Sequence, residues 1–228
     1  MKPATKARRR VNGFGAATMV AAMVMISFAS QAQDNWKLVK DEDGIRVFTQ
    51  PVSGSDFKEF KGETDFDETL QHCVGFLMSV PHMTEWMHET MKVELVSKEN
   101  DHDRVLYMIQ NAPFPVRDRD FFVRNTLSQQ PDDTVVYTMD LVPNKVVDSG
   151  YVHLKGMRGR VTLTPLSATR THVEYRAHVD PGGAIPSWVA NAFVTDTPFH
   201  TLKNARRVVQ SMKTRLSFAS IRNRGDAK

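Results

Sequence analysis

Apolar and polar residues alternate along much of the chain between positions 45 and 180. Successive side chains of a strand point to opposite faces of a sheet, so this period of two predicts half-buried strands. Short polar turns, several of them containing proline or glycine, separate the alternating segments. The segments predicted as strands are 45–50, 57–66, 92–97, 104–110, 120–129, 134–142, 151–166 and 171–180. Strands that follow one another through tight turns predict a mostly antiparallel sheet.

Helical spacing replaces this alternation early in the chain. Residues 70–77 place leucine, cysteine and valine side chains on one helical face, and Asp67 is the predicted N-cap. Pro81 ends that helix, because proline cannot continue it. A second, short helix is predicted around 83–87.

The end of the chain predicts one long amphipathic helix. From Ile185 to position 216 apolar residues recur at intervals of three and four. Pro186 suits a first turn, whereas Pro198 lies inside and is predicted to kink or interrupt the helix. The concave side of a curved sheet is the available cover for the apolar face. We therefore predict an α+β fold, with either an elongated apolar cavity or a solid core between helix and sheet.

Residues 1–32 have the three parts of a secretory signal peptide. Five basic residues come first, an apolar run spans 16–29, and Ser30 and Ala32 supply the small side chains that a signal peptidase needs. We expect an exported protein, periplasmic or secreted, with an uncleaved leader acting as an anchor as the alternative. The predicted domain covers residues 33–220, and 221–228 form a basic C-terminal tail.

Charge and composition exclude several classes of function. The 228 residues carry a net charge of +4, but the leader holds five of the 30 basic residues and no acidic one, so the rest of the chain is nearly neutral. A general nucleic-acid binder therefore loses its main argument, and we predict no nucleic-acid partner. Cys73 is the single cysteine and occupies an apolar helical position, which predicts a buried, inert thiol.

The chain shows no recognised catalytic or metal-binding pattern. His82 and His88 are six residues apart, and none of the eight histidines fits a zinc-ligand spacing. No serine-nucleophile elbow is present, and Asp118 and Asp120 lie among arginines that favour their ionised form. We predict no catalytic residue, no metal and no cofactor, and hence no enzyme.

Several short motifs occur in order between about residues 36 and 216. They are Trp36-Lys37-Leu38, the segments 43–48, 52–55 and 85–87, Pro113 to Asp120, the strand pair 163–166 and 171–175, and above all Asp180 to Asn191. Together these motifs resemble bacterial members of the START (steroidogenic acute regulatory-related lipid transfer) family. The resemblance implies a START-like helix-grip fold, in which a curved antiparallel sheet wraps around the long C-terminal helix. It also implies that a single hydrophobic lipid occupies a central cavity. Because the helix-grip superfamily includes cyclases and hydrolases, an enzyme acting on a hydrophobic small molecule is the alternative.

The resemblance also points to cavity residues. Members that bind phospholipid or sterol often carry a cavity arginine six positions after the arginine matching Arg119. This chain has Asn125 there, and Arg124 lies on the opposite face unless a bulge turns it inward. The residues predicted to line the cavity or its lid are Phe122, Arg124, Asn125, Val189, Phe193, Thr197 and Leu202.

The predicted function is to bind one lipid (phospholipid, sterol-like or another hydrophobic molecule) and to transfer or present it between membranes of the cell envelope. The protein is expected to be a monomer that contacts a membrane surface transiently. Its predicted membrane-facing residues are the basic side chains Lys203, Arg206, Arg207 and Lys213.

Overall fold

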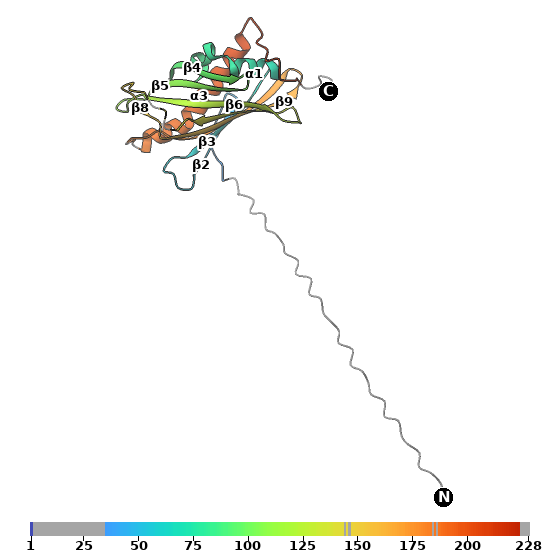
Figure 1. The fold of residues 1–228 in the computed structure, drawn as a ribbon, viewed down its shortest axis with the longest axis horizontal. Coiled ribbons are helices and arrows are strands. Elements are labelled where there is room, and N and C mark those ends of the chain that lie inside the picture. The colour runs from blue at the N-terminus through green and yellow to red at the C-terminus, as the bar shows by residue number, and fades with distance from the viewer. Residues whose placement is uncertain (2–34, 144, 146, 184, 186, 224–228) are drawn as a thin grey trace. The chain divides into compact units, whose positions relative to one another are not determined.

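The computed structural model describes residues 1, 35–143, 145, 147–183, 185 and 187–223. All of the predicted leader except Met1 lies outside the described residues. Within the described part of the chain, one ten-stranded sheet dominates residues 35–223 (Figure 1). Its strands are β1 (Lys37–Glu42), β2 (Ile45–Gln50), β3 (Glu59–Phe66), β4 (Thr90–Asn100), β5 (Asp103–Gln110), β6 (Arg119–Gln129), β7 (Val135–Leu141), β8 (Val152–His153), β9 (Gly156–Ser167) and β10 (Arg170–Asp180).

The strands are ordered β1-β2-β3-β10-β9-β7-β6-β5-β4, and every neighbouring pair on this path is antiparallel. The two-residue strand β8 adds to β6 in parallel. The predicted antiparallel sheet is therefore confirmed. Two details were wrong: the segment 151–166 divides into β8 and β9, and β1 was not predicted as a strand. β1 escapes the pattern because, as an edge strand, it is exposed along almost its whole length.

Three α-helices and one 3₁₀ turn are described alongside the sheet. They are α1 (Leu70–Met78), the 3₁₀ turn η1 (Val80–His82), α2 (Met83–Trp86) and α3 (Ser187–Ser211). The N-cap of α1 is Thr69, whose hydroxyl accepts the His72 backbone N–H at 3.2 Å, so the predicted cap at Asp67 is wrong.

α3 lies along the sheet and packs mainly against β2, β3 and α2 (Figure 1). Of the predicted kink or interruption at Pro198, the interruption is wrong, because α3 continues through this residue. Pro198 is buried where α3 approaches β3, and a Cβ added at Gly62 of β3 would lie only 3.0 Å from the Pro198 Cβ. The missing side chain at Gly62 thus allows the helix to approach closely, and the packing holds the proline within the helix.

A second apolar cluster lies on the other face of the sheet. Tyr107, Ile109 and Phe122 pack together there, with Val142 and Tyr151 of the β7–β8 connection against them. This cluster is separate from the main core between the sheet and the helices.

The Asp120 carboxylate, fully buried, fastens the same connection to the sheet. It accepts hydrogen bonds from the Tyr107 hydroxyl at 2.7 Å and from the Ser149 hydroxyl at 2.6 Å, and it contacts His153 Nδ1. Burial, followed by the bond to this carboxylate, raises the pKa of Tyr107 to about 12. The network therefore has a structural role: it attaches the β7–β8 connection to β5 and β6.

After α3 the chain turns back over α1, and we name residues 212–223 the C-terminal strap. His72 of α1 accepts the Leu216 backbone N–H at Nδ1 (2.9 Å), and its Nε2 lies 3.2 Å from the Val209 carbonyl. The Gln71 backbone N–H donates to the Asn223 side chain at 3.0 Å, and Ile221 is only 1% exposed. Residues 221–223, at the start of the predicted tail, therefore pack on the domain.

Acid should weaken the link between β2, β3 and β10. Glu59 accepts two bonds from Arg176, at 2.7 and 3.0 Å, and one from Gln50 at 2.8 Å. Burial opposes ionisation, but these bonds outweigh it and hold the pKa of Glu59 below its ordinary value of 4.5. A depressed carboxyl pKa contributes stability that is present above pH 4.5 and lost as the pH falls through the folded-state pKa.

The variant Glu59→Gln should lower the free energy of unfolding by about 2 kcal/mol at neutral pH and by much less in acid. Urea titrations across the acid range measure this difference. The matched control is Glu94→Gln, which removes an exposed carboxylate that pairs with Lys92 on β4 and should change stability by less than about 0.5 kcal/mol. An equal loss of unfolding free energy for Glu59→Gln at every pH would contradict the stabilising role of the ionised Glu59 carboxylate.

Candidate functional site

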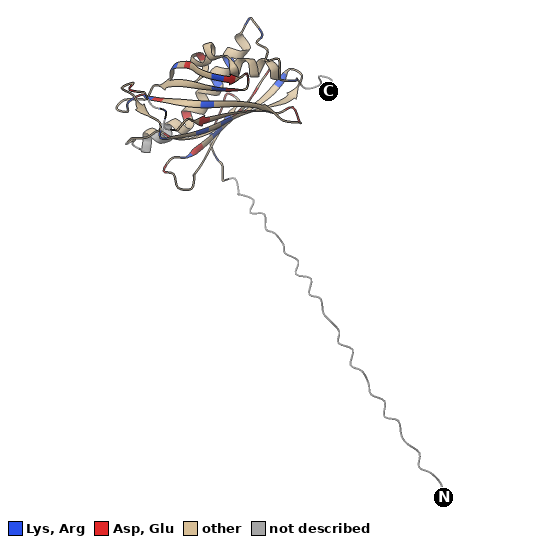
Figure 2. Cartoon of the chain, in the orientation of Figure 1, with Lys and Arg blue, Asp and Glu red and all other residues tan. Residues whose placement is uncertain are grey.

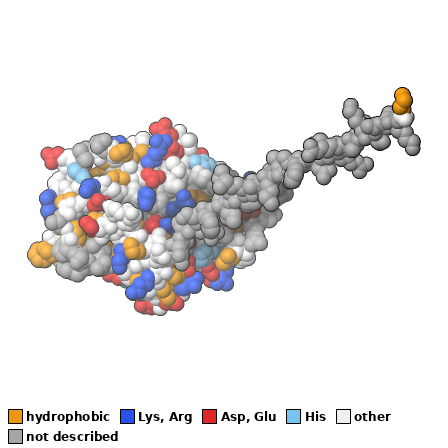
Figure 3. Space-filling view, turned by 90° about the horizontal axis from the view of Figure 1, so that it is seen from below, with side chains coloured by type: hydrophobic (Ala, Val, Ile, Leu, Met, Phe, Trp, Pro, Cys, Tyr) orange, Lys and Arg blue, Asp and Glu red, His pale blue; other side chains and the backbone are white. Residues whose placement is uncertain are grey.

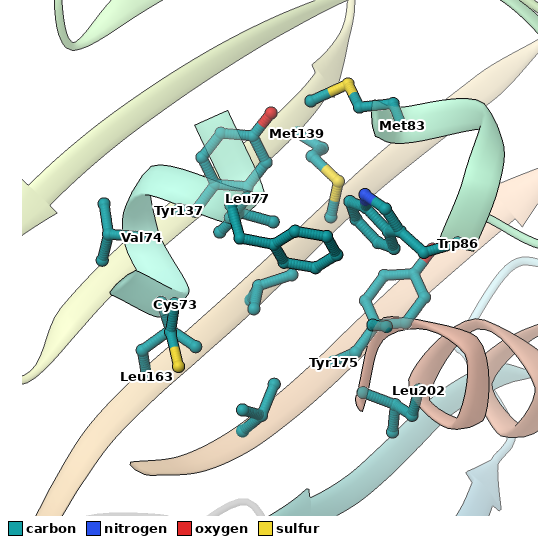
Figure 4. Packing of buried hydrophobic residues seen from close by; sticks show 14 of the residues in the cluster. Cys73, Val74, Leu77, Met83, Trp86, Tyr137, Met139, Leu163, Tyr175 and Leu202 are labelled. Carbon is teal, nitrogen blue, oxygen red and sulfur yellow. The ribbon is translucent and has the colours of Figure 1, made fainter. Parts of the chain in front are cut away.

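An apolar chamber lies between the concave face of the sheet and the helices, and we call it the inner chamber. Side chains from all three α-helices reach it, among them Phe76 of α1, Trp86 of α2 and Leu202 of α3. Figure 4 shows this part of the core, where helix residues converge on side chains of the sheet such as Tyr175. No charged side chain lines the inner chamber among the described residues.

A second, more polar chamber continues from it, and we call it the outer chamber. Phe193, Val194 and Thr197 of the first half of α3 line one side, together with charged residues such as Lys58 and Glu89. Met157 and Tyr175 line both chambers. The two chambers are therefore neighbours that share two wall residues.

The hollow is present but narrow. The inner and outer chambers have volumes of about 50 and about 100 Å³, enough for several water molecules but not for a whole lipid. Methionine is abundant in the inner wall, which includes Met83, Met87, Met108, Met139 and Met157. Methionine side chains are unbranched and adaptable, so this wall can repack around a guest at low cost.

Five of the predicted cavity residues lie on the expected side of the sheet or on α3. Asn125 and Leu202 line the inner chamber, and Phe193 and Thr197 line the outer chamber. Val189 is completely buried but lines neither chamber. Four of these five residues therefore line a chamber.

Phe122 and Arg124 were wrong as cavity residues. Both lie on the outer face of β6: Phe122 belongs to the second apolar cluster, and Arg124 is exposed and binds Asp103 through contacts of 2.5 to 3.2 Å. Alternate residues of a strand share a face, so Asn125 and these two side chains cannot all point inward without a bulge. β6 pairs with β5 in unbroken register through this region.

The four predicted membrane-facing residues do not form one free basic surface. Lys203 pairs with Asp43 at 2.6 Å, and Arg206 donates to the Asp43 carbonyl and to Thr64. Both cations therefore attach α3 to the β1–β2 turn. Arg207 and Lys213 are exposed.

The wider surface shows the same mixture of charges. Lysines and arginines are interspersed with aspartates and glutamates over the strands (Figure 2), and the face in Figure 3 shows no continuous basic field. Nothing in these views favours a polyanionic partner.

Arg104 is a buried residue near the site that sequence reasoning missed. It lies directly opposite Asn125 in the β5–β6 register, and its guanidinium donates to the Met78 carbonyl at 2.5 Å and to the Tyr137 hydroxyl at 3.3 Å. Arg104 thus satisfies a carbonyl at the end of α1 and holds that helix against the sheet. The available signal was its inward position in the alternation with Leu106 and Met108.

Arg119 lines the outer chamber but has a structural task. Its guanidinium donates to the backbone carbonyls of Arg117, Pro181 and Gly182. Burial lowers its pKa. These bonds join the start of β6 to the segment that leads into α3, which fixes one side of the outer chamber.

Titratable groups of the inner chamber are neutral. Burial raises the pKa of the Cys73 thiol to about 12, and it also raises the pKa of Tyr175. A protonated thiol is a poor nucleophile, so the prediction of a buried, inert cysteine is consistent with this environment. Among the described residues, no group of three or more histidine, cysteine or acidic side chains is arranged to hold a metal ion. None of the described helices is long and apolar enough to cross a membrane.

Two polar atoms in the inner wall have no hydrogen-bond partner among the described residues. They are Trp86 Nε1 and Asn125 Oδ1, and both belong to residues that are more than nine-tenths buried. Trp86 was not predicted as a site residue; it lies on the four-residue helix α2, too short for a periodic pattern to reveal which way it points.

A curved antiparallel sheet that grips a long C-terminal helix over an apolar chamber defines a helix-grip protein with a site for a hydrophobic ligand. The START domain family model matches residues 19–215, and the chain belongs to this family.

Individual relatives agree with that assignment. An uncharacterised protein of Pseudomonas aeruginosa is 31% identical over 194 residues, which cover 85% of this chain and 96% of that protein. The phosphatidylcholine transfer protein of Mus musculus is 25% identical over 170 residues, 69% of this chain and 75% of that protein. The solved STAR-related lipid transfer protein of Xanthomonas axonopodis has a TM-score of 0.72 and 34% identity, and it covers 78% of this chain and 100% of that structure.

Proposed function

We propose that this protein is an exported lipid carrier that binds one hydrophobic lipid beneath α3 and moves it between membranes of the cell envelope. Lipid binding and transfer, in general terms, follow from membership of the START family and from relatives named as lipid transfer proteins. The observation that carries the proposal is the pair of neighbouring chambers, the inner one apolar and the outer one more polar. The leader-like composition of residues 1–32 supports export.

The energetics suit exchange rather than permanent capture. Burying about 400 Å² of acyl or sterol surface contributes roughly 10 kcal/mol at about 25 cal/mol per Å². A bilayer offers similar burial, so a lipid can pass between membrane and protein without an energy source. The lipid can cross the aqueous space because the chamber shields its apolar surface from water.

The loop of residues 111–118 between β5 and β6 is the proposed membrane-docking element. Asn111 and Ala112 line the outer chamber, and Phe114 projects beyond them with 92% of its surface exposed. An exposed aromatic side chain beside a cavity opening is well placed to enter the interfacial region of a bilayer. Arg207, exposed on α3, is a further contact for anionic headgroups.

A helix-grip enzyme was the alternative, and no observation favours it. The thiol of Cys73, which lines the inner chamber, is held protonated by burial. No charged side chain lines that chamber among the described residues. The structure therefore supports binding better than turnover.

Native mass spectrometry of protein purified from its own cell envelope tests the proposal, and we expect one co-purified lipid per chain. The variant Ala205→Leu should reduce occupancy about tenfold, because Ala205 of α3 lines the inner chamber and a larger side chain takes the lipid's space. Its thermal midpoint should not fall, since the added carbons fill a hollow. Unchanged occupancy in this variant would place the lipid elsewhere and defeat the proposal.

A further inference from the structure

The inner chamber carries a small polar site that its apolar walls do not explain. Trp86 Nε1 is a donor and Asn125 Oδ1 an acceptor; the two residues are 7% and 2% exposed, and neither atom has a hydrogen-bond partner among the described residues. A buried polar atom without a partner costs free energy, and native proteins rarely keep two in one chamber. The pair therefore points to a ligand group that both accepts and donates.

The lining of the inner chamber disfavours a charged group at this position. No charged side chain lines the inner chamber among the described residues. Arg104 lies opposite Asn125 in the β5–β6 register but does not line the inner chamber; its two terminal nitrogens donate to the Met78 carbonyl and the Tyr137 hydroxyl, and only its Nε lacks a partner among the described residues. A phosphate or carboxylate here would lack a direct counter-ion, which is costly in an apolar space.

We propose that the inner chamber selects neutral lipids that end in a hydroxyl group. The hydroxyl donates to Asn125 Oδ1 and accepts from the Trp86 indole N–H. The hydrocarbon part extends past Met157 and Tyr175 into the outer chamber. This inference rests on the proposed carrier function and adds the chemical class of the cargo, which differs from that of a phosphatidylcholine carrier.

Four probes that differ at the polar end test the selection. They are hexadecanol, its methyl ether, hexadecanoate and dihexadecanoyl phosphatidylcholine, each supplied from cyclodextrin to delipidated protein and quantified in competition by native mass spectrometry. The alcohol makes both bonds, while the ether accepts but cannot donate. We expect the affinity for hexadecanol to exceed that for its ether about tenfold, which corresponds to one hydrogen bond. Its affinity should exceed that of both charged probes by a larger factor.

Two variants separate the two bonds. Asn125→Leu should bring the alcohol down to the ether's affinity and leave ether binding unchanged. Trp86→Phe should weaken alcohol and ether equally, about tenfold, because both accept from the lost N–H. Ile109→Leu, a volume-conserving change in the second apolar cluster on the other face of the sheet, is the control and should leave every ratio unchanged. Asn125→Leu should fold normally, since it removes a buried polar atom that has no partner.

The outcomes distinguish a failure of hydroxyl selection from a failure of the carrier function. Tighter binding of hexadecanoate or phosphatidylcholine than of hexadecanol would overturn the hydroxyl selection while keeping the carrier function. An alcohol preference that survives Asn125→Leu would likewise overturn it. If wild-type protein with a native near-ultraviolet circular dichroism spectrum binds none of the four probes, the carrier function itself fails.

Discussion

Replacing Phe114 by glutamate should slow lipid transfer between vesicles at least about tenfold and leave lipid binding in solution unchanged. Phe114 lines neither chamber, so its loss does not disturb bound cargo. Its ring is almost fully exposed at the tip of the 111–118 loop, and inserting such a ring into a bilayer interface contributes about 2 kcal/mol. A carboxylate at that position removes this gain and adds repulsion from anionic lipids. Fluorescent-lipid transfer and vesicle co-sedimentation measure the two effects.

The control for this variant is Leu95→Glu. Leu95 is also apolar and 51% exposed, but it lies within the edge strand β4 and lines neither chamber. It should transfer lipid at the wild-type rate. Equal slowing by both substitutions would show a general effect of negative charge, and normal transfer by Phe114→Glu would remove the loop from the docking model.

Replacing Gly75 by alanine should destabilise the domain by about 2 kcal/mol, although alanine is the better helix former by about 1 kcal/mol. A Cβ at position 75 would lie 2.9 Å from the Leu216 Cβ and 3.0 Å from both the Leu216 carbonyl carbon and the Ser217 nitrogen. Backbone atoms cannot turn away as a flexible side chain can, so the C-terminal strap must lift from α1. Its release exposes Ile221 and breaks the bonds to His72, a loss of about 3 kcal/mol.

Urea unfolding of three further proteins assigns the effect. Ile221→Ala should lose about 2–4 kcal/mol by itself, because the side chain is buried in the same contact. The other two proteins end at residue 211, one with Gly75 and one with the Gly75→Ala substitution. Between these two, the substitution should raise the free energy of unfolding by about 1 kcal/mol instead of lowering it. A stabilising Gly75→Ala in the full chain would mean that the strap does not pack against α1 in solution.

Local patterns predict most of the regular elements of this fold. The alternation in β10 reflects one face toward the core, and the spacing after residue 185 reflects one buried stripe on α3. β1 gives no such signal, because an exposed edge strand has no face to distinguish. Pro198 misleads for a related reason: its local preference opposes a helix, and packing against Gly62 overrides it.

The candidate site is predictable only in part. The residue matching a family arginine identifies Asn125, and alternation alone places Arg124 and Phe122 on the other face. Trp86 is invisible to any periodic argument, since α2 contains four residues. The strap is equally hidden, because its position depends on a glycine in α1 that is more than 130 residues away in the chain.

The amino-acid sequence by itself specifies which side chains are apolar and which of them share a face, because the periods of strand and helix determine this. It also specifies that the apolar face of a long helix must be covered by the sheet. Three-dimensional packing alone decides that Arg104 meets Met78 and Tyr137, while Trp86 Nε1 and Asn125 Oδ1 find no hydrogen-bond partner within the described part of the chain. Hydrogen bonds act over about 3 Å, and distances of that size between remote segments arise only when the folded chain brings them together.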